Sequence, residues 1–248
     1  MMLIDGRLFE PQVLPTIFFG SSKPLAYVLN PKVASTFAMN FVFYANHGYR
    51  FFEPFEIYRS RHALLRFEGP EIDRHALKTY YSLAPETFSF VRDPLQRFIS
   101  GFLNKVFTAG DTHYFGYRDQ LTSLYGIDLS PEADPRQSII AFARLIAANK
   151  RQGTIDVHFR PQYLNLAIDS RFTVETILRL EEPEAMQAFA ARWVGVEKAR
   201  ELLAIRMNER LKYTTQDVIS DELTDLVRGI YAKDYEIFYS GAENLLAA

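Results

Sequence analysis

The fold is decided by Phe90-Val91-Arg92-Asp93-Pro94-Leu95-Gln96-Arg97-Phe98-Ile99-Ser100, a stretch in which a short apolar strand gives way to a helix. The strand is expected over Thr87–Val91, which is apolar and follows Pro85. Asp93 is suited to cap the helix. Pro94 fits its first position, because the N–H that proline lacks would have no partner inside the helix there. The stretch therefore predicts a strand that turns directly into a helix.

The helix that begins at Pro94 is predicted to have one apolar face. Its apolar residues recur with a 3.6-residue period, at Leu95, Phe98, Ile99, Phe102, Leu103, Val106 and Phe107. Arg97, Ser100 and Asn104 are expected on the opposite face. Arg92 stands at the carboxyl end of the strand, where open α/β sheets bind ligands, and with Ser100 and the free N–H groups at the helix start it forms a receptor suited to a phosphate. Alone, such a corner is more often structural, so it needs a partner elsewhere.

A second strand-loop-helix corner lies upstream. Leu25–Leu29 is a short apolar run, Asn30–Thr36 follows as a compact turn, and a helix is predicted from about Ser35 to Asn46, closed by Gly48. Lys32 would lie over the loop, and Ser35 and Thr36 would offer hydroxyl and N–H groups to a phosphate. The loop lacks the G-x-x-x-x-G-K-[ST] spacing of a Walker A motif. A Pro-Lys pair before a helix is more often an exposed turn than a catalytic lysine.

Two histidines are candidate general bases. Phe55–Tyr58 is predicted as a strand that brings His62 to the same sheet edge, next to arginines whose charge would keep its imidazole neutral. The alternative is an ordinary surface histidine. A second cluster, His158-Phe159-Arg160-Pro161-Gln162, places a histidine, an arginine and an amide in one predicted loop and is suited to a polar substrate.

The remaining chain alternates helices, strands and one long irregular segment. Residues 109–136 lack a clear period, and we interpret them as an acceptor-binding lid or, with equal weight, a mobile surface excursion. The other predicted elements are helices over Glu71–Leu83, Ser138–Ala148 and Ser220–Tyr239, a strand over Phe172–Leu180, and a helix start after Glu181-Glu182-Pro183.

Composition limits the classes of protein. The chain has 248 residues, 48% of them hydrophobic and 23% charged, so a single folded domain over residues 1–248 is the simplest expectation. A net charge of −2 argues against a protein that binds nucleic acid or an anionic membrane through its overall field. The absence of cysteine excludes disulfides and a cysteine nucleophile. With neither a signal peptide nor a membrane span predicted, we expect a soluble, cytoplasmic protein.

Two basic strand-loop-helix corners with a histidine between them resemble the sulfotransferases that use 3′-phosphoadenosine 5′-phosphosulfate (PAPS), and more closely their carbohydrate (Golgi-type, family 2) branch. Pro31–Thr36 is similar to the loop that binds the 5′-phosphosulfate, and Phe90–Ser100 to the 3′-phosphate motif. His158–Gln162 resembles the family's His-x-x-Pro-Gln segment, and Tyr231–Phe238 its terminal helix. The resemblance extends over about residues 25–240. It departs in Ala34, where many relatives have glycine, and in lacking the anchor and cysteines of secretory-pathway relatives.

The resemblance implies a P-loop NTPase-like three-layer α/β sandwich, with a central parallel sheet flanked by helices. It also implies a sulfotransferase that moves a sulfuryl group from PAPS to a hydroxyl acceptor, such as a sugar, and releases 3′-phosphoadenosine 5′-phosphate (PAP) without a metal. The implied roles are catalysis by Lys32, His62 or His158, with His62 preferred as the base. The implied donor-binding residues are Lys32, Val33, Ala34, Ser35, Thr36, Arg92, Ser100 and Lys212.

Two other functions stay open from the sequence. A P-loop kinase-like phosphotransferase would prefer ATP and Mg²⁺, and the missing Walker order speaks against it. A catalytically inactive nucleotide-binding interaction protein would keep the cleft and use residues 109–136 to bind a partner. The acceptor's identity and the oligomeric state cannot be read from the residues.

Overall fold

The computed structural model describes residues 3–4, 7–8, 15–52, 57, 63–67, 74–108, 115–149, 152, 155–168, 173–204 and 213–240. The chain divides into two compact units. The first comprises Met1–Val91 and Gln162–Met207, and the second comprises Arg92–Pro161 and Asn208–Ala248. Each unit has an apolar core of its own. That the two form one functional domain stays a prediction.

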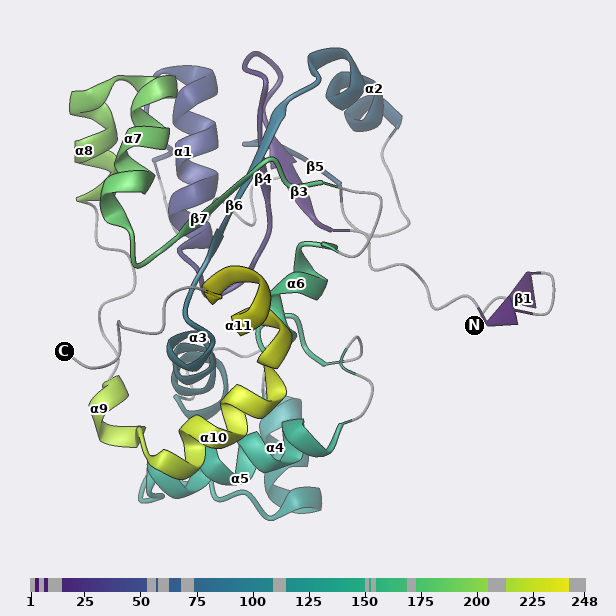
Figure 1. The fold of residues 1–248 in the computed structure, drawn as a ribbon, viewed down its shortest axis with the longest axis vertical. Helices are drawn as coiled ribbons and strands as arrows, with labels where there is room; N and C mark the ends of the chain where they lie inside the picture. The colour runs from purple at the N-terminus through teal and green to yellow at the C-terminus, as the bar shows by residue number, and fades with distance from the viewer. Residues whose placement is uncertain are drawn as a thin grey trace. The chain divides into compact units, whose positions relative to one another are not determined.

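The first unit contains a five-stranded sheet in the order β5-β3-β4-β6-β7 (Figure 1). Its strands are β3 (Ile17–Phe19), β4 (Leu25–Val28), β5 (Leu65–Phe67), β6 (Glu86–Val91) and β7 (Thr176–Arg179). β4, β6 and β7 are parallel, which confirms the predicted α/β class and its parallel centre. β3 is antiparallel to both of its neighbours, so the sheet is mixed.

Sequence patterning missed the two antiparallel strands. β3 and β5 have three residues each, too few for a period to emerge. The strand predicted over Phe55–Tyr58 lies outside the described residues except for Ile57, which is in a turn. A separate antiparallel pair joins β1 (Leu3–Ile4) to β2 (Arg7–Leu8).

Helices α1 (Ser35–His47), α7 (Pro183–Val194) and α8 (Val196–Leu203) pack together, with α1 against β4 and α7 against β7 (Figure 1). The unit also contains α2 (Arg74–Leu83) and α6 (Gln162–Asn165). Aromatic rings link the layers: the Phe41 ring lies 5.7 Å from Phe88 and 6.1 Å from Phe189. This packing fixes α1, whose first residues follow the end of β4.

Within the described residues, the second unit is helical. Its helices are α3 (Pro94–Gly101), a π-helix (Phe102–Phe107), α4 (Phe115–Tyr125), α5 (Pro135–Ala148), α9 (Thr215–Val218), α10 (Asp221–Ile230) and α11 (Ala232–Tyr239). The apolar stripe predicted from Leu95 to Phe107 is buried in its core, as expected. Phe98, Phe142 and Phe159 meet there, with ring centroids 4.8 to 5.8 Å apart.

The helices of this unit differ from the prediction in three places. The helix from Pro94 changes to π geometry at Phe102, although its apolar face continues. The final helix is broken at Tyr231, whose hydroxyl donates a 2.6 Å hydrogen bond to the carbonyl of Phe159. The described part of the segment 109–136 contains α4 and the start of α5, so it is more regular than the sequence pattern indicated, and its role as a lid or a surface excursion stays a prediction. Across the described ranges, none of the helices combines the length and apolar character that crossing a bilayer requires.

Candidate functional site

The loop between β4 and α1 has an unusual backbone. Lys32 and Ala34 have φ angles of 68° and 60°, whereas Val33 between them and the helical Ser35 after them do not have positive φ. A left-handed conformation costs a non-glycine residue roughly 1–2 kcal/mol. Alternation between left-handed and other conformations directs successive N–H groups to one side, which is how backbone nests bind anions. The backbone of this loop is therefore strained, and its conformation is suited to binding an anion.

The N-terminus of α1 lies at the end of this loop and is left open. The N-cap residue is Ala34, no side chain caps the helix, and its first turn has no acidic residue. The N–H groups of the first turn have no acceptor inside the helix, and the helix dipole adds partial positive charge there. This end of α1 is thus electrostatically suited to a phosphate or a sulfate.

The predicted donor-binding residues of this loop differ in exposure. Val33 is buried in the core, whereas Lys32 and Thr36 are partly exposed. The Ser35 hydroxyl, which we expected to face the donor, donates a 2.7 Å hydrogen bond to the carbonyl of Asn30. Ser35 thereby closes the loop, and what it can still offer an anion is chiefly its backbone N–H.

The corner between β6 and α3 is built differently. The Asp93 carboxylate accepts a 2.9 Å hydrogen bond from the N–H of Gln96, and Pro94 occupies the first turn, as predicted. The Tyr235 hydroxyl lies 3.3 Å from the other Asp93 oxygen, and burial, together with Asp93, raises the pKa of Tyr235. The carboxylate occupies the Gln96 N–H and disfavours an anion at this helix start, whereas the predicted phosphate contacts of this corner stay a prediction. The partly exposed Arg92 and Ser100 side chains remain as the candidates.

Arg97 is not on a solvated face, which corrects the prediction. Its side chain is 1% exposed, and it donates hydrogen bonds to the carbonyls of Arg160 at 2.9 Å and Val157 at 3.1 Å. Buried charges persist only when their hydrogen-bonding capacity is met, and here loop carbonyls meet it. Arg97 therefore fixes the loop that carries His158.

His158 has a carboxylate partner that the sequence interpretation overlooked. Its Nδ1 lies 2.8 Å from Oδ1 of Asp156, and its backbone N–H donates to the same oxygen at 2.9 Å. The His158 side chain is 22% exposed. A base oriented by a third group is typical of general-base sites. His62 and Lys212, the other predicted site residues, lie outside the described residues.

Gln162 is buried, so its predicted place in a substrate-facing cluster is wrong. Its Oε1 accepts a 2.9 Å hydrogen bond from the side chain of Asn30, which is also fully buried. The only feature of the sequence that indicates this Asn30–Gln162 hydrogen bond is the position of Asn30 in a turn, directly before Pro31. The structure thus brings Lys32–Thr36 together in one loop of the first unit, and keeps Arg92, Ser100 and His158 in the second.

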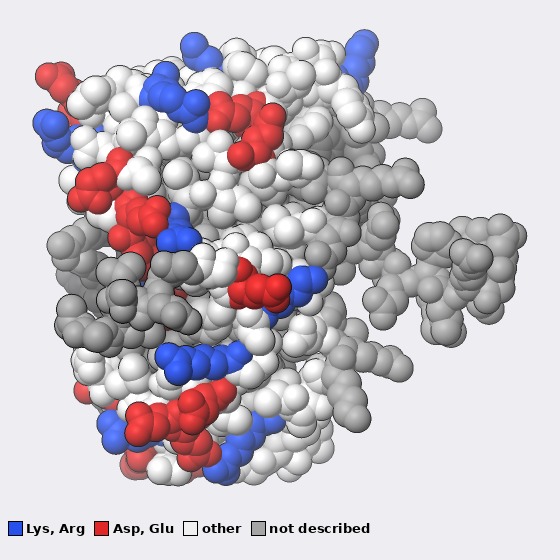
Figure 2. All heavy atoms as spheres, viewed as in Figure 1, with Lys and Arg blue, Asp and Glu red and all other residues white. Residues whose placement is uncertain are grey.

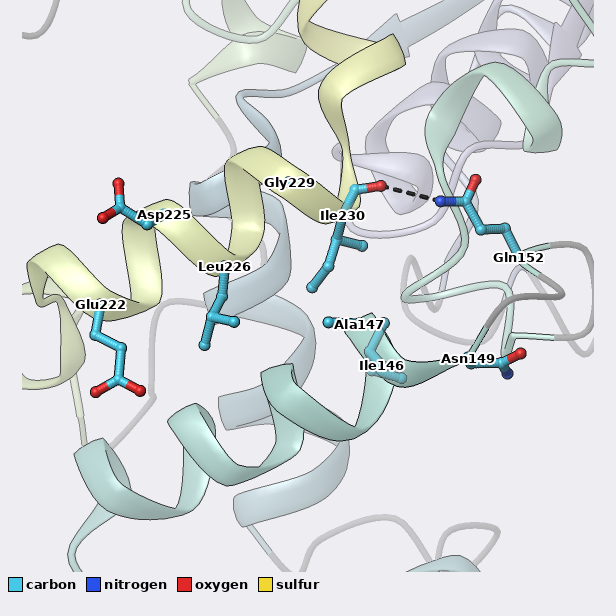
Figure 3. Close-up of a pocket in the computed structure, with 9 residues that line it drawn as sticks. All are labelled: Ile146, Ala147, Asn149, Gln152, Glu222, Asp225, Leu226, Gly229 and Ile230. Carbon is cyan, nitrogen blue, oxygen red and sulfur yellow. Dashed lines mark hydrogen bonds between the residues drawn. The ribbon is translucent and has the colours of Figure 1, made fainter.

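A cavity of about 600 Å³ lies between α5 and α10 of the second unit (Figure 3). Ile146, Leu226 and Ile230 line its apolar part, and Glu222 and Asp225 its acidic part. These carboxylates disfavour a polyanionic donor there. On the face drawn in Figure 2, acidic and basic side chains are interspersed. An anion site on this chain must therefore be local.

Comparison with known proteins gives one match. A model of the sulfotransferase family matches residues 15–240, a range that includes both corners and the His158 loop. Neither the comparison with curated proteins nor that with solved structures gives a match. In the part of the chain that the structure describes, no three histidine, aspartate or glutamate side chains are grouped as metal ligands.

Proposed function

The chain belongs to the sulfotransferase family, and from this premise we propose that it transfers a sulfuryl group from PAPS to a hydroxyl of a carbohydrate or glycoconjugate. One observation carries the proposal: an uncapped helix start, preceded by two left-handed residues, one of which is a lysine. That combination is suited to the phosphosulfate end of the donor. The family supports sulfuryl transfer in general, and donor and acceptor are our assignment.

The 5′-phosphosulfate is assigned to residues Lys32–Thr36. In this assignment the backbone N–H groups of the loop and of the first turn of α1 bind the phosphate oxygens. The Lys32 ammonium lies over the bridging oxygen that leaves. Positioning and charge stabilisation account for most of the catalysis of such transfers, so these groups supply what the reaction needs.

The 3′-phosphate is assigned to the Arg92 and Ser100 side chains, with Lys212 added from the family resemblance. An arginine binds a phosphate through two parallel charge-assisted hydrogen bonds, and a serine hydroxyl adds a third. Because ATP lacks a 3′-phosphate, these contacts would distinguish PAPS from ATP. The Asp93 carboxylate occupies the Gln96 N–H and disfavours an anion at this helix start, which supports phosphate binding by the Arg92 and Ser100 side chains.

The reaction proceeds by in-line displacement in this proposal. The acceptor oxygen forms a bond to sulfur while the bond from sulfur to the phosphate oxygen breaks. The bonding pair leaves with that oxygen, which Lys32 stabilises as PAP departs. The acceptor's proton passes to a neutral histidine, which becomes an imidazolium and releases the proton to solvent before the next turnover.

Two histidines compete for the role of base. We assign it to His62 on the family resemblance, because the base of related sulfotransferases follows a strand at the sheet edge that binds the donor. His158 is the second candidate, favoured by the hydrogen bond between its Nδ1 and Asp156. The two assignments can be distinguished by measuring turnover in two variants, one lacking each histidine, because only the loss of the base should lower it strongly.

Calorimetric titration with PAP, and separately with Mg²⁺–ATP, tests the donor assignment. We expect PAP to bind with micromolar or tighter affinity and ATP at least about tenfold more weakly, the difference that lost arginine contacts imply. Transfer of radiolabelled sulfate from PAPS to sugar acceptors then tests the reaction. Tighter binding of Mg²⁺–ATP than of PAP would favour a kinase-like phosphotransferase. PAP binding without transfer to any hydroxyl acceptor would favour a nucleotide-binding interaction protein.

A further inference from the structure

Three amide side chains form a buried cluster beneath the Lys32 loop. Asn30 and Gln162 are 0% exposed and Asn165 is 5% exposed. All three belong to the first unit, where Asn30 follows β4, and Gln162 and Asn165 bound the short helix α6. Buried amides are costly unless their hydrogen-bonding groups are paired, so their partners indicate what the cluster fixes.

The Asn30 side chain uses both of its amide hydrogens. Nδ2 donates to the carbonyl of Phe90 at 3.0 Å and to Oε1 of Gln162 at 2.9 Å. Its Oδ1 accepts from Nδ2 of Asn165 at 3.3 Å. One residue therefore connects the start of the loop to the end of β6 and to both ends of α6.

The backbone of Asn30 is held as well. Its carbonyl accepts a 2.7 Å hydrogen bond from the Ser35 hydroxyl and a 3.3 Å bond from the Tyr27 hydroxyl, and its N–H donates to that tyrosine. Asn30 and Ser35 are the two ends of the loop, and their hydrogen bond closes it. The four residues between them include the left-handed Lys32 and Ala34.

We infer that Asn30 and Gln162 are positioning residues that hold the Lys32 loop in its donor-binding shape before the donor arrives. The inference rests on the proposed function of that loop. Strained backbone persists only where the surroundings over-determine it, and the buried amide cluster supplies that constraint. Neither side chain needs to touch the donor, because both act through the backbone of residues 31–35.

The test compares Gln162→Ala with Asn46→Ala. Asn46 lies in the last turn of α1, at the opposite end from the Lys32 loop, where its Oδ1 accepts from the N–H groups of Ser22 and Lys23. Both substitutions remove a hydrogen-bonded amide side chain from the same unit. Asn46→Ala therefore reproduces a general loss of stability at a distance from the loop.

Three measurements are made on each full-length variant: the melting temperature, the affinity for PAP, and amide hydrogen exchange of residues 32–36 without ligand. We expect Gln162→Ala to bind PAP about tenfold more weakly, because a buried donor loses its partner and the loop loosens. KM should rise for the donor and stay constant for the acceptor, and exchange at residues 32–36 should accelerate. Asn46→Ala should lower the melting temperature without changing exchange or PAP affinity.

Asn30→Ala removes the central residue of the cluster and is a second variant. If it fails to fold, Gln162→Ala still tests whether the cluster positions the loop. Wild-type PAP affinity and unchanged exchange at residues 32–36 in Gln162→Ala would overturn the inference and leave the cluster a purely structural one. If the unsubstituted protein binds no PAP, the proposed donor is wrong. The exchange comparison then decides the inference separately: acceleration in Gln162→Ala but not in Asn46→Ala supports it, and equal exchange overturns it.

Discussion

The two corners have the same arrangement, a strand followed by a helix, but differ in the charge at the start of the helix. After β4, the residue before the helix is Ala34, left-handed and without a side-chain cap. After β6, it is Asp93, whose carboxylate accepts the hydrogen bond of the Gln96 N–H. The first corner offers an anion its backbone, whereas at the second the Asp93 cap disfavours an anion at the backbone and leaves the Arg92 and Ser100 side chains as candidates. Two corners that look alike in sequence therefore offer different groups, which is why the proposed function assigns them to different phosphates of the donor.

The difference also separates catalysis from recognition. In the proposed mechanism, the backbone N–H groups and Lys32 bind the phosphosulfate, where the bond breaks, so they would act on the transition state. An arginine and a serine at a capped corner act mainly on affinity. Substitution of Lys32 should therefore chiefly change turnover, and substitution of Arg92 should chiefly change donor binding.

The largest effect is expected at the first corner. Lys32→Ala should lower kcat by about 10²–10⁴-fold, the range for losing a group that stabilises developing charge. Single-turnover transfer from PAPS measures it. Lys23→Ala, which removes an exposed lysine from the same unit, is the matched control and should keep wild-type kcat. A kcat for Lys32→Ala within about twofold of wild type would remove Lys32 from the mechanism.

The general base gives an effect of similar size. His62→Ala should lower kcat by about 10²–10⁴-fold, whereas His158→Ala should leave it nearly unchanged. Comparison of the two rates with a saturating acceptor is the measurement. The reverse result would assign the base to His158, and Asp156→Asn would then lower kcat as well, because it removes the carboxylate that orients the ring.

An intermediate effect is expected at the second corner. Arg92→Ala should weaken PAP binding by about 10–100-fold, the value of a charge-assisted pair of hydrogen bonds, with a smaller change in kcat. Calorimetry with PAP measures it. Arg144→Ala, on the surface of α5 where Arg144 pairs with Glu222, is the control of equal charge and should bind PAP normally. Equal affinity of Arg92→Ala and wild type would contradict the phosphate role.

Local chemistry made both corners predictable. The Asp93 cap, Pro94, the apolar stripe from Leu95 to Phe107 and the Gly48 end of α1, with its φ of 76°, all follow from residues a few positions apart. Loop strain and partners distant in sequence were not predictable from such patterns. Asn30 and Gln162 are 132 residues apart, so no period links them.

Arg97 illustrates the same limit in a charged residue. Helical periodicity places a polar residue on the face opposite the apolar stripe, and it says nothing about what else covers that face. In the structure the carbonyls of Val157 and Arg160, about 60 residues further on, meet the guanidinium there. Sequence patterns therefore could not show which of the predicted polar residues are buried and which are exposed.

The smallest effect comes from moving the cap of the second corner to the first. Ala34→Asp places a carboxylate at the open start of α1, at a position whose left-handed φ of 60° aspartate and asparagine tolerate better than most residues. Ala34→Asn is the neutral control of nearly equal size. Because the added charge opposes the phosphosulfate and competes for the same N–H groups, Ala34→Asp should bind PAP about tenfold more weakly than Ala34→Asn. Asp93→Asn should leave PAP affinity within about twofold of wild type, since asparagine also caps helices and no anion depends on that helix start. Equal PAP affinity of the two Ala34 variants would mean that the first corner does not bind the donor through its backbone, and the contrast between the corners would then have no functional meaning.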